Sequence, residues 1–572
     1  MRKRCALILI IIVLFGAVEV GALELYPLNQ IKPGLRGVGR TVISGTTIEN
    51  FEVEVLGLVP QSPPVQDLIM VRVSGEPIER SGGIALGMSG SPVYIGGRLV
   101  GAISHTFSQT DYHIGLVTPA EDMFRIYDEP MHHAPTLPEG VREVRSPLII
   151  QGLNERNTEY LRQGLERYQV QLMPSAAKDA EPPQAPLEAG SMIGVQLLRG
   201  DFTVASFGTV THVRDDGRFI AYGHPFTHRG AVDYFAADAY VHYTLPSREV
   251  PYKIVSLGNT IGAIDQDRAA GIGGVLDAEA AYVPATITVW DKDRDLRHTY
   301  RVESVTEAGV LIPLLISSAY QSVDATLDRV GEGTSFVRLE FSSADLAQRM
   351  IRENLFYSDT DIAVWSLTDL MAGLELLVNN SVQHLDLEHV QVDLEIARER
   401  KTATIESASP GKFNVRPGEN VDVLVTLRPY RAASETRMLR LQIPADTAPG
   451  LMTVTVRGGA ADHYTVKPPT HIGILDQSDD DEPIRSVVSG AETLDTLIRE
   501  YMESERNNEI IAEYYPFLQN YAGGESELDE GTDNFEDAYS YYGWNSTGEA
   551  ERVRLSTQFV LDGAATFDLN IY

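Results

Sequence analysis

Cysteine is nearly absent from this sequence: among 572 residues only Cys5 is a cysteine. Because Cys5 lies in an N-terminal segment that we expect to be removed, the mature chain would have no cysteine. Disulfide bonds, thiol catalysis and cysteine-ligated metals are therefore excluded. His224 and His228 have no Glu or Cys companion at a recognisable zinc spacing, so we expect neither a metal nor a cofactor. An exported protein without disulfides fits a bacterial envelope or exterior better than a eukaryotic secretory route.

Basic residues are also scarce, with 47 Lys and Arg against 80 Asp and Glu and a formal net charge of −33. A surface of this charge repels nucleic acid and anionic lipid. We therefore expect no nucleic-acid partner, and membrane contact at most through an uncleaved signal segment. The chain is too long for one hydrophobic core, which favours several domains.

The first 22 residues have the three parts of an export signal. Basic residues at positions 2–4 precede an almost unbroken apolar run at 6–18, and the small residues at 20–22 suit signal peptidase. The apolar run is short for a bilayer span, which favours a cleaved signal peptide over an anchor. We expect cleavage after Ala22 and a mature protein in the periplasm or outside the cell.

Short runs of alternating apolar and polar residues, separated by turn residues, predict a mainly β protein. The expected regions, in chain order, are a β lobe at 23–130, a connector at 131–190, a second β lobe at 191–310, a mixed helix and strand region at 311–398, a β-sandwich at 399–470, and a C-terminal region at 471–572 with a helix, an acidic disordered segment and terminal strands. Helices are expected from Thr118 on and at 154–168, 343–356, 366–378 and 492–514. The acidic segment at 523–537 is poor in aliphatic residues, which favours disorder.

The hexapeptide Gly87-Met88-Ser89-Gly90-Ser91-Pro92 has the composition of a nucleophile turn. A serine nucleophile needs a hydroxyl that projects from a tight turn, backbone N–H groups aimed at the oxyanion, and a base within reach. Glycines on both sides of Met88-Ser89 allow the sharp turn and the close approach of an amide to the substrate. We therefore expect Ser89 to attack and the N–H groups of Gly87 and Ser89 to form the oxyanion hole, while Ser91 supports the turn. The alternative is an ordinary glycine-rich turn between strands.

This turn and its flanking strands resemble the serine peptidases of the SpoIVB (stage IV sporulation protein B) family, and also the Gly-Asp-Ser-Gly-Gly-Pro segment of chymotrypsin-like peptidases. The matching pieces are Phe51-Glu52-Val53-Glu54-Val55, Ser81-Gly82-Gly83-Ile84 and Gly101-Ala102-Ile103-Ser104-His105-Thr106-Phe107. A second stretch, Gly208-Thr209-Val210-Thr211 followed by Ala221-Tyr222-Gly223-His224, resembles the family segment that carries the catalytic histidine. The resemblance implies two β-barrel-like lobes of chymotrypsin-like type that pack face to face, with His224 as the base.

The chain departs from the family pattern in three ways. Its serine segment precedes its histidine segment, the reverse of the family order, which implies a circular permutation; a catalytic triad depends on geometry and tolerates this. No PDZ-like segment is found. Ser74 stands where the family has an acidic residue, so the third catalytic member is unassigned. The possible third members are Glu76, Glu79, Asp233 and Asp265.

A second histidine competes for the role of base. His105 lies on the strand that follows the serine turn and shares its position with a family histidine. Packing or hydrogen bonding within the lobe is its preferred role, and catalysis is the alternative.

Two functions remain open. The first is an exported serine endopeptidase whose substrate is a protein or peptide, such as an envelope protein or the chain itself, as the family resemblance implies. The second is a non-catalytic envelope scaffold in which peptidase-like lobes bind without cleaving. The missing acid and the changed order favour the scaffold, whereas the retention of both Ser89 and His224 favours the peptidase.

Overall fold

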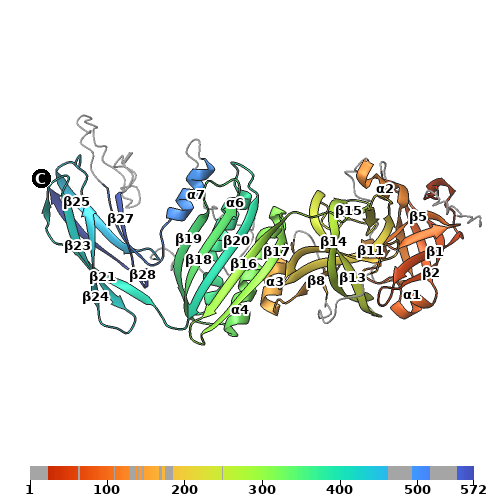
Figure 1. Cartoon of the computed structure of the whole chain (residues 1–572), viewed down its shortest axis with the longest axis horizontal. Coiled ribbons are helices and arrows are strands. Elements are labelled where there is room, and N and C mark those ends of the chain that lie inside the picture. Colours follow the sequence, from red (N-terminus) through yellow and green to blue (C-terminus); the bar gives the residue numbers. More distant parts are fainter. Residues whose placement is uncertain are drawn as a thin grey trace, which may run out of the picture.

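The computed structural model describes residues 23–61, 65–107, 110–128, 137, 141–144, 147–166, 171–173, 185–247, 249–460, 493–515 and 551–572. The expected signal peptide and the expected disordered segment at 523–537 lie outside these residues. The described chain is mainly β, as the sequence predicts. Its parts follow one another along an elongated molecule, from the N-terminal strands at one end to the C-terminal strands at the other (Figure 1).

The N-terminal part forms a closed six-stranded antiparallel barrel, which we call the serine barrel. Its strands pair in the order β4-β1-β2-β3-β6-β5, and β5 pairs back to β4. The barrel elements are η1 (Leu28–Gln30), β1 (Arg36–Val42), β2 (Ile48–Val59), β3 (Leu68–Ser74), α1 (Glu76–Ser81), β4 (Pro92–Ile95), β5 (Arg98–Phe107), β6 (Ile114–Pro119) and α2 (Ala120–Asp128), and β7 (Val141–Glu143) joins the edge of β5. Phe51, Val53 and Val55 of β2 are buried and Glu52 is exposed, so the predicted alternation is confirmed.

The next part closes into a second six-stranded antiparallel barrel, which we call the histidine barrel. Its pairing order is β10-β13-β14-β15-β12-β11, and β11 pairs back to β10. The strands are β10 (Met192–Gly200), β11 (Thr203–Val213), β12 (Arg218–Ala221), β13 (Gly230–Leu245), β14 (Tyr252–Arg268) and β15 (Gly271–Leu276). Between the barrels in sequence lie β8 (Pro147–Gln151), α3 (Glu155–Gly164) and β9 (Gln171–Met173). Two closed antiparallel barrels side by side are the chymotrypsin-like arrangement that the resemblance implies.

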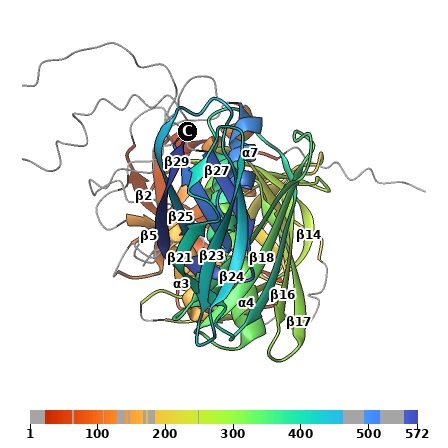
Figure 2. The same cartoon turned by 90° about the vertical axis from the view of Figure 1, so that its left-hand side faces the viewer.

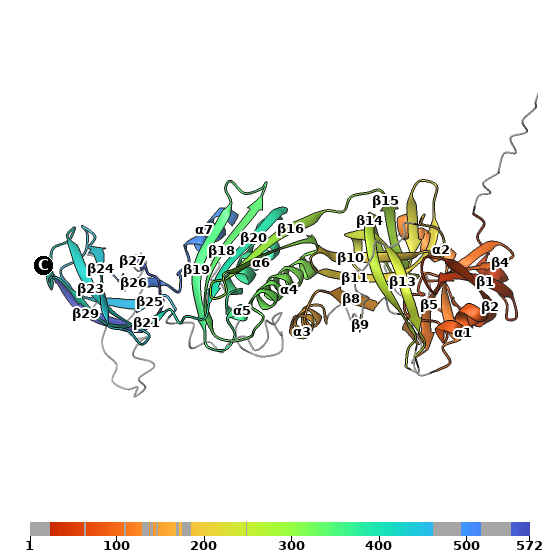
Figure 3. The ribbon, with the colours of Figure 1, turned by 60° about the horizontal axis from the view of Figure 1, so that its bottom comes forward.

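The sheet of the histidine barrel continues into a third region. From β10 it runs through β17 (Leu296–Val305), β16 (Tyr282–Asp291), β20 (Leu387–Ala397), β18 (Gly333–Ser343) and β19 (Met350–Ser358). The helices α4 (Ala308–Leu327), α5 (Ile362–Trp365) and α6 (Thr368–Asn379) lie against this sheet (Figure 3). Although α4 is long and apolar enough to cross a membrane, 94% of its apolar window is buried. It is therefore a core helix of this region.

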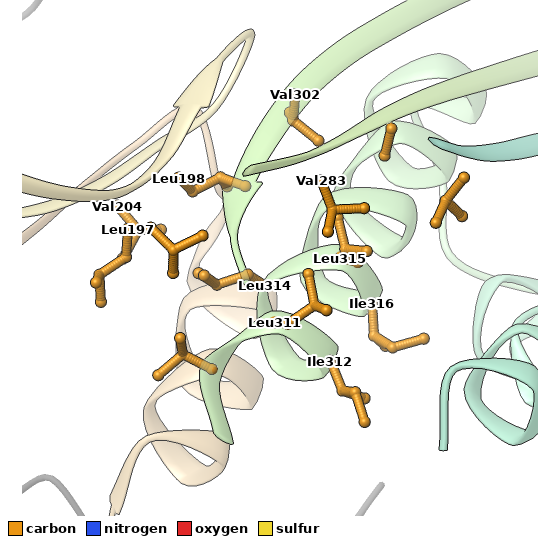
Figure 4. Close-up of a cluster of buried hydrophobic side chains, with 14 of the residues drawn as sticks. Leu197, Leu198, Val204, Val283, Val302, Leu311, Ile312, Leu314, Leu315 and Ile316 are labelled. Carbon is orange, nitrogen blue, oxygen red and sulfur yellow. The ribbon is translucent and has the colours of Figure 1, made fainter. Parts of the chain in front are cut away.

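A continuous hydrophobic core joins the histidine barrel to the third region. Leu311, Leu314 and Leu315 of α4 lie between Leu197 and Leu198 of β10 on one side and Val283 and Val302 of β16 and β17 on the other (Figure 4). These side chains are almost fully buried. The shared core holds the histidine barrel and the third region together as one packed unit.

The C-terminal part, which faces the viewer in Figure 2, is a β-sandwich of two sheets. One sheet has the order β24-β23-β21-β28 and the other β22-β29-β25-β26-β27. Its strands are β21 (Thr402–Pro410), β22 (Asn414–Val415), β23 (Asn420–Pro429), β24 (Glu435–Gln442), β25 (Gly450–Gly458), β26 (Glu509–Tyr514), β27 (Glu551–Ser556), β28 (Val560–Asp562) and β29 (Ala564–Ile571). The helix α7 (Leu494–Glu503), which precedes β26 in sequence, instead contacts α6 and β19 of the third region. The last strands of the chain thus complete both sheets.

Two expected helices are corrected by the structure. The prediction at 343–356 is wrong, because β18 ends at Ser343 and β19 begins at Met350. Arg352 and Asn354 point inward in β19, where Arg352 binds the Asp369 carboxylate at 2.7 Å, and these buried polar side chains hid the alternation. The prediction at 492–514 is correct only as far as Glu503, since β26 follows from Glu509. The expected helices at 154–168 and 366–378 are present as α3 and α6.

Candidate active site between the two barrels

The turn that carries Ser89 lies between β5 and the histidine barrel. Within the serine barrel, the N–H of Gly90 donates to Ile103 O over 2.8 Å and the N–H of Ile103 donates to Ser91 O over 3.0 Å. Gly87 and Gly90 have φ angles of +92° and +89°, a backbone conformation that favours glycine. The glycines on both sides of Met88-Ser89 are therefore required by the sharp turn that the sequence predicts.

The histidine barrel binds the same turn from the other side through β11. The N–H of Thr209 donates to Ser89 O over 2.8 Å, and its hydroxyl donates to Gly87 O over 2.9 Å. The hydroxyl of Thr211 donates to Gly90 O over 2.8 Å. The Gly208-Thr209-Val210-Thr211 stretch of the sequence therefore fixes the position of the serine turn.

Gly90 leaves no room for a side chain at this contact, which gives a testable prediction. A Cβ at Gly90 would lie 1.9 Å from Thr209 O and 2.5 Å from Tyr222 N, so Gly90→Ala must push the barrels apart. We expect the free energy of unfolding of the barrels, measured by calorimetry of the full chain, to fall by about 3 kcal/mol or more. Gly97→Ala is the matched control, since Gly97 also has a positive φ of +81° but no atom within 4 Å of its Cβ position. Equal losses in the two variants would contradict the tight contact.

The Ser89 hydroxyl is buried and has no hydrogen-bond partner. Ser89 is 0% exposed, and its Oγ contacts no donor or acceptor among the described residues. Ser91 Oγ is in the same state. In the described part of the chain, the backbone hydrogen bonds of the turn also leave the N–H groups of Gly87 and Ser89 without an acceptor. A buried polar group without a partner is costly, and a catalytic role is one physical reason for keeping it.

His224 follows β12 and is 1% exposed. Its Nδ1 lies 2.7 Å from Pro225 O and its Nε2 lies 3.0 Å from Val144 O. Both ring nitrogens therefore face carbonyl oxygens, which only accept hydrogen bonds. In this arrangement Nε2 is not free to accept a proton from another group.

The structure brings the neighbourhoods of Ser89 and His224 together. The carbonyl oxygen of Ile103 accepts from the Gly90 N–H at 2.8 Å, and a Cβ at Gly223 would lie 3.3 Å from the same oxygen. Gly90 and Gly223 are the direct sequence neighbours of the two predicted catalytic residues. No hydrogen bond joins Ser89 Oγ to the His224 ring within the described residues.

His105 is the other histidine of the site. Its ring centroid lies 6.4 Å from that of His224, and its Nδ1 lies 2.8 Å from Ser104 Oγ. Burial, followed by repulsion from His224, lowers the pKa of His105 from 6.5 to about 3. His105 is therefore neutral at physiological pH and a weak proton acceptor.

None of the four predicted acidic partners contacts His224 through a hydrogen bond of the described residues. Asp233 accepts from the N–H of Ala281 and Asp265 from the hydroxyl of Tyr127, and burial raises the pKa of both carboxyls. The α1 carboxylates also have other neighbours: Glu76 pairs with Arg80, while Glu79 lies 3.9 Å from His113 Nε2. The hydroxyl of Ser74 donates to Glu52. The third catalytic member therefore remains unassigned.

Two buried charged groups escaped the sequence analysis. Asp267 is 1% exposed and accepts from the N–H groups of Phe226, Thr227 and His228, so it fixes the loop that follows His224. Lys253 is 0% exposed and its Nζ lies 3.2 Å from Gly87 O in the serine turn. Neither lies in a recognisable motif, so no sequence signal would have identified them.

Comparison with known families agrees with the serine segment. Residues 21–124, which include the serine turn, match the family described as SpoIVB peptidase S55. No curated protein and no solved structure matches the chain significantly. The resemblance to SpoIVB peptidases inferred from the sequence is thereby confirmed for this segment, and it supports a peptidase.

Proposed function

We propose that this chain is an exported serine endopeptidase of the SpoIVB type, in which Ser89 is the nucleophile and His224 the base. One observation carries the proposal most strongly: among the described residues, the buried Ser89 hydroxyl has no hydrogen-bond partner, and the N–H groups of Gly87 and Ser89 in the same turn have no acceptor. The family match of residues 21–124 supports the same reaction class. No cofactor is needed for this reaction.

The proposed reaction follows from these groups. Once Nε2 no longer faces Val144 O, His224 takes the proton of Ser89 as Oγ bonds to the carbonyl carbon of the substrate, and the two N–H groups stabilise the oxyanion. The C–N bond then breaks as His224 returns the proton to the leaving amine, and water releases the acyl group by the same route.

The substrate is a peptide bond of an envelope protein or of the chain itself. The protein works in the periplasm or outside the cell after cleavage behind Ala22.

His224 is a better candidate for the base than His105. With a pKa of about 3, the His105 ring takes up a proton too weakly to assist attack at neutral pH. Its bond to Ser104 Oγ, which also accepts from the hydroxyl of Thr118, supports a packing role within the serine barrel. The hydroxyl of Thr118 is also 2.7 Å from Gly223 O, which links this network to the residue before His224.

A fluorophosphonate probe tests the proposal. We expect the folded full chain to incorporate one phosphonyl group slowly, and mass spectrometry of its peptides to place the label on Ser89. The label should not form after denaturation, because activation of the hydroxyl needs both barrels. A folded chain that carries no label, or carries it on a different residue, would contradict the proposal.

The alternative function is a non-catalytic envelope scaffold. Two observations favour it: no carboxylate among the described residues binds His224, and Ser89 is 0% exposed. An inert scaffold predicts no labelling under any condition that preserves the fold. The same probe therefore separates the two functions.

A further inference from the structure

A short segment of the chain lies across the site as an added strand. This segment, which we call the strap, consists of β7 (Val141–Glu143) and Val144. It pairs antiparallel with β5, with His105 opposite Glu143, Thr106 opposite Arg142 and Phe107 opposite Val141. Because the pairing is antiparallel, the strap ends at Val144 beside Ser104, close to where the pairing of β4 with β5 ends at Ala102.

The last residue of the strap reaches the catalytic groups. The N–H of Val144 donates to Ser104 O over 2.7 Å, and Val144 O lies 3.0 Å from His224 Nε2. The Val144 side chain is 1% exposed and belongs to the hydrophobic core of the serine barrel. The strap therefore places a backbone carbonyl against the proposed base, and an apolar side chain in the core of the serine barrel.

We infer that the edge of β5 from Ser104 to Phe107 is a peptide-binding site and that the strap is its built-in ligand. This inference rests on the proposed peptidase function. A peptide that adds a strand to an exposed edge gains affinity from main-chain hydrogen bonds and selectivity from pockets for alternate side chains. Strap and substrate compete for this edge, so the described conformation is an inhibited one.

The strap also indicates which substrates fit. An external substrate is an extended segment with a small, β-branched apolar residue at the position of Val144, because this side chain is enclosed by the barrel core. Its N–H replaces that of Val144 at Ser104 O. Displacement of Val144 O frees His224 Nε2 to accept the proton of Ser89.

The test compares strap variants of the full chain by the rate at which a fluorophosphonate labels Ser89. Val144→Pro removes the N–H that binds Ser104 O, so we expect labelling about tenfold faster than in the wild type. Val144→Ile keeps the N–H and the branched apolar side chain, and should label like the wild type. If Val144→Pro does not fold, Val144→Gly replaces it. This variant loses only the buried side chain, and its Ser89 should also be labelled faster than in the wild type.

A peptide supplied in trans tests whether the strap is a true ligand of the edge. The octapeptide with the sequence of residues 139–146 should slow the labelling of the Val144→Pro protein, whereas the same peptide carrying Val144→Pro should not. Equal labelling of wild type and Val144→Pro, or no effect of the octapeptide, would contradict the role of the strap as a ligand of this edge. Neither result would contradict the proposed peptidase function. Absence of label in every folded variant would instead overturn the proposed function itself.

Discussion

Replacement of Ser89 by alanine should abolish fluorophosphonate labelling and lower ester or peptide hydrolysis by about 10⁴-fold or more, the scale of loss when a serine nucleophile is removed. The reason is that Ser89 is the proposed nucleophile, and it lies between Gly87 and Gly90 at the centre of the sharp turn. Labelling and hydrolysis are best measured for Ser89→Ala both alone and combined with Val144→Pro. The strap is displaced in the Val144→Pro background, so the loss of activity is largest there.

Ser91→Ala is a closely matched control for this experiment. Both hydroxyls are buried and lack a partner among the described residues, and both residues are 0% exposed. Removing either hydroxyl relieves a desolvation cost, so each variant should be more stable than the wild type by about 1 kcal/mol. Only Ser89→Ala should lose labelling and hydrolysis. If Ser91→Ala abolished the label and Ser89→Ala did not, the assigned nucleophile would be wrong.

The expected gain in stability has a functional meaning. In the described conformation Ser89 lacks the hydrogen bond to a base that activates a nucleophile, and a buried hydroxyl without a partner destabilises the folded state. Active sites commonly retain such groups at a cost in stability. Equal stability of wild type and Ser89→Ala would contradict a cost of burying this hydroxyl.

Local patterns in the sequence were sufficient to predict the serine turn and many strands of the two barrels. Phe51, Val53 and Val55 alternate with acidic residues because β2 has one face in the core, and this pattern is visible without a structure. The glycines around Met88-Ser89 signal the turn because their positive φ angles favour glycine. The prediction of a helix at 343–356 was wrong because the buried Arg352 interrupts the alternation of apolar and polar residues that a strand normally shows.

Contacts between distant segments could not be predicted. The strap meets His224 across 80 positions and Lys253 meets Gly87 across 166, and neither pair is marked by a motif. Closure of two barrels against each other creates both contacts. A carbonyl oxygen leaves no trace in side-chain composition, so the contact of Val144 O with His224 is visible only in the structure.

Lys253 provides the second large effect, because its ammonium group lies in the interface without a counter-charge. Its Nζ contacts Thr41 Oγ1 at 3.1 Å, Gly87 O at 3.2 Å and Met192 Sδ at 3.2 Å, and no carboxylate pairs with it in the described part of the chain. Burial lowers the pKa of Lys253 from 10.5 to about 7. Desolvation is the cause, since a charged amine loses its hydration in the protein interior.

This lowered pKa makes the stability of the barrels depend on pH. Between pH 7 and 10.5 the amine is neutral in the folded chain and protonated in the unfolded chain, so the unfolded chain binds more protons. The contribution of Lys253 to stability therefore rises with pH across this window and is lowest at and below pH 7. Across the whole window from pH 7 to 10.5 this change amounts to about 5 kcal/mol, at about 1.4 kcal/mol per pH unit.

Lys253→Met removes this dependence while keeping a long apolar side chain. We expect the stability of the variant relative to the wild type to fall by about 1.4 kcal/mol per pH unit between pH 7.5 and 9.5. Calorimetry of the full chain at several pH values measures it, and Lys32→Met, at an exposed lysine, should show no such slope. The variant also loses the hydrogen bond to Thr41, which changes its free energy of unfolding by the same amount at every pH. Only the slope of the difference against pH therefore reports the titration of Lys253. A slope near zero would mean that the amine is as well solvated when folded as when unfolded, and the closed interface around the serine turn would have to open to water.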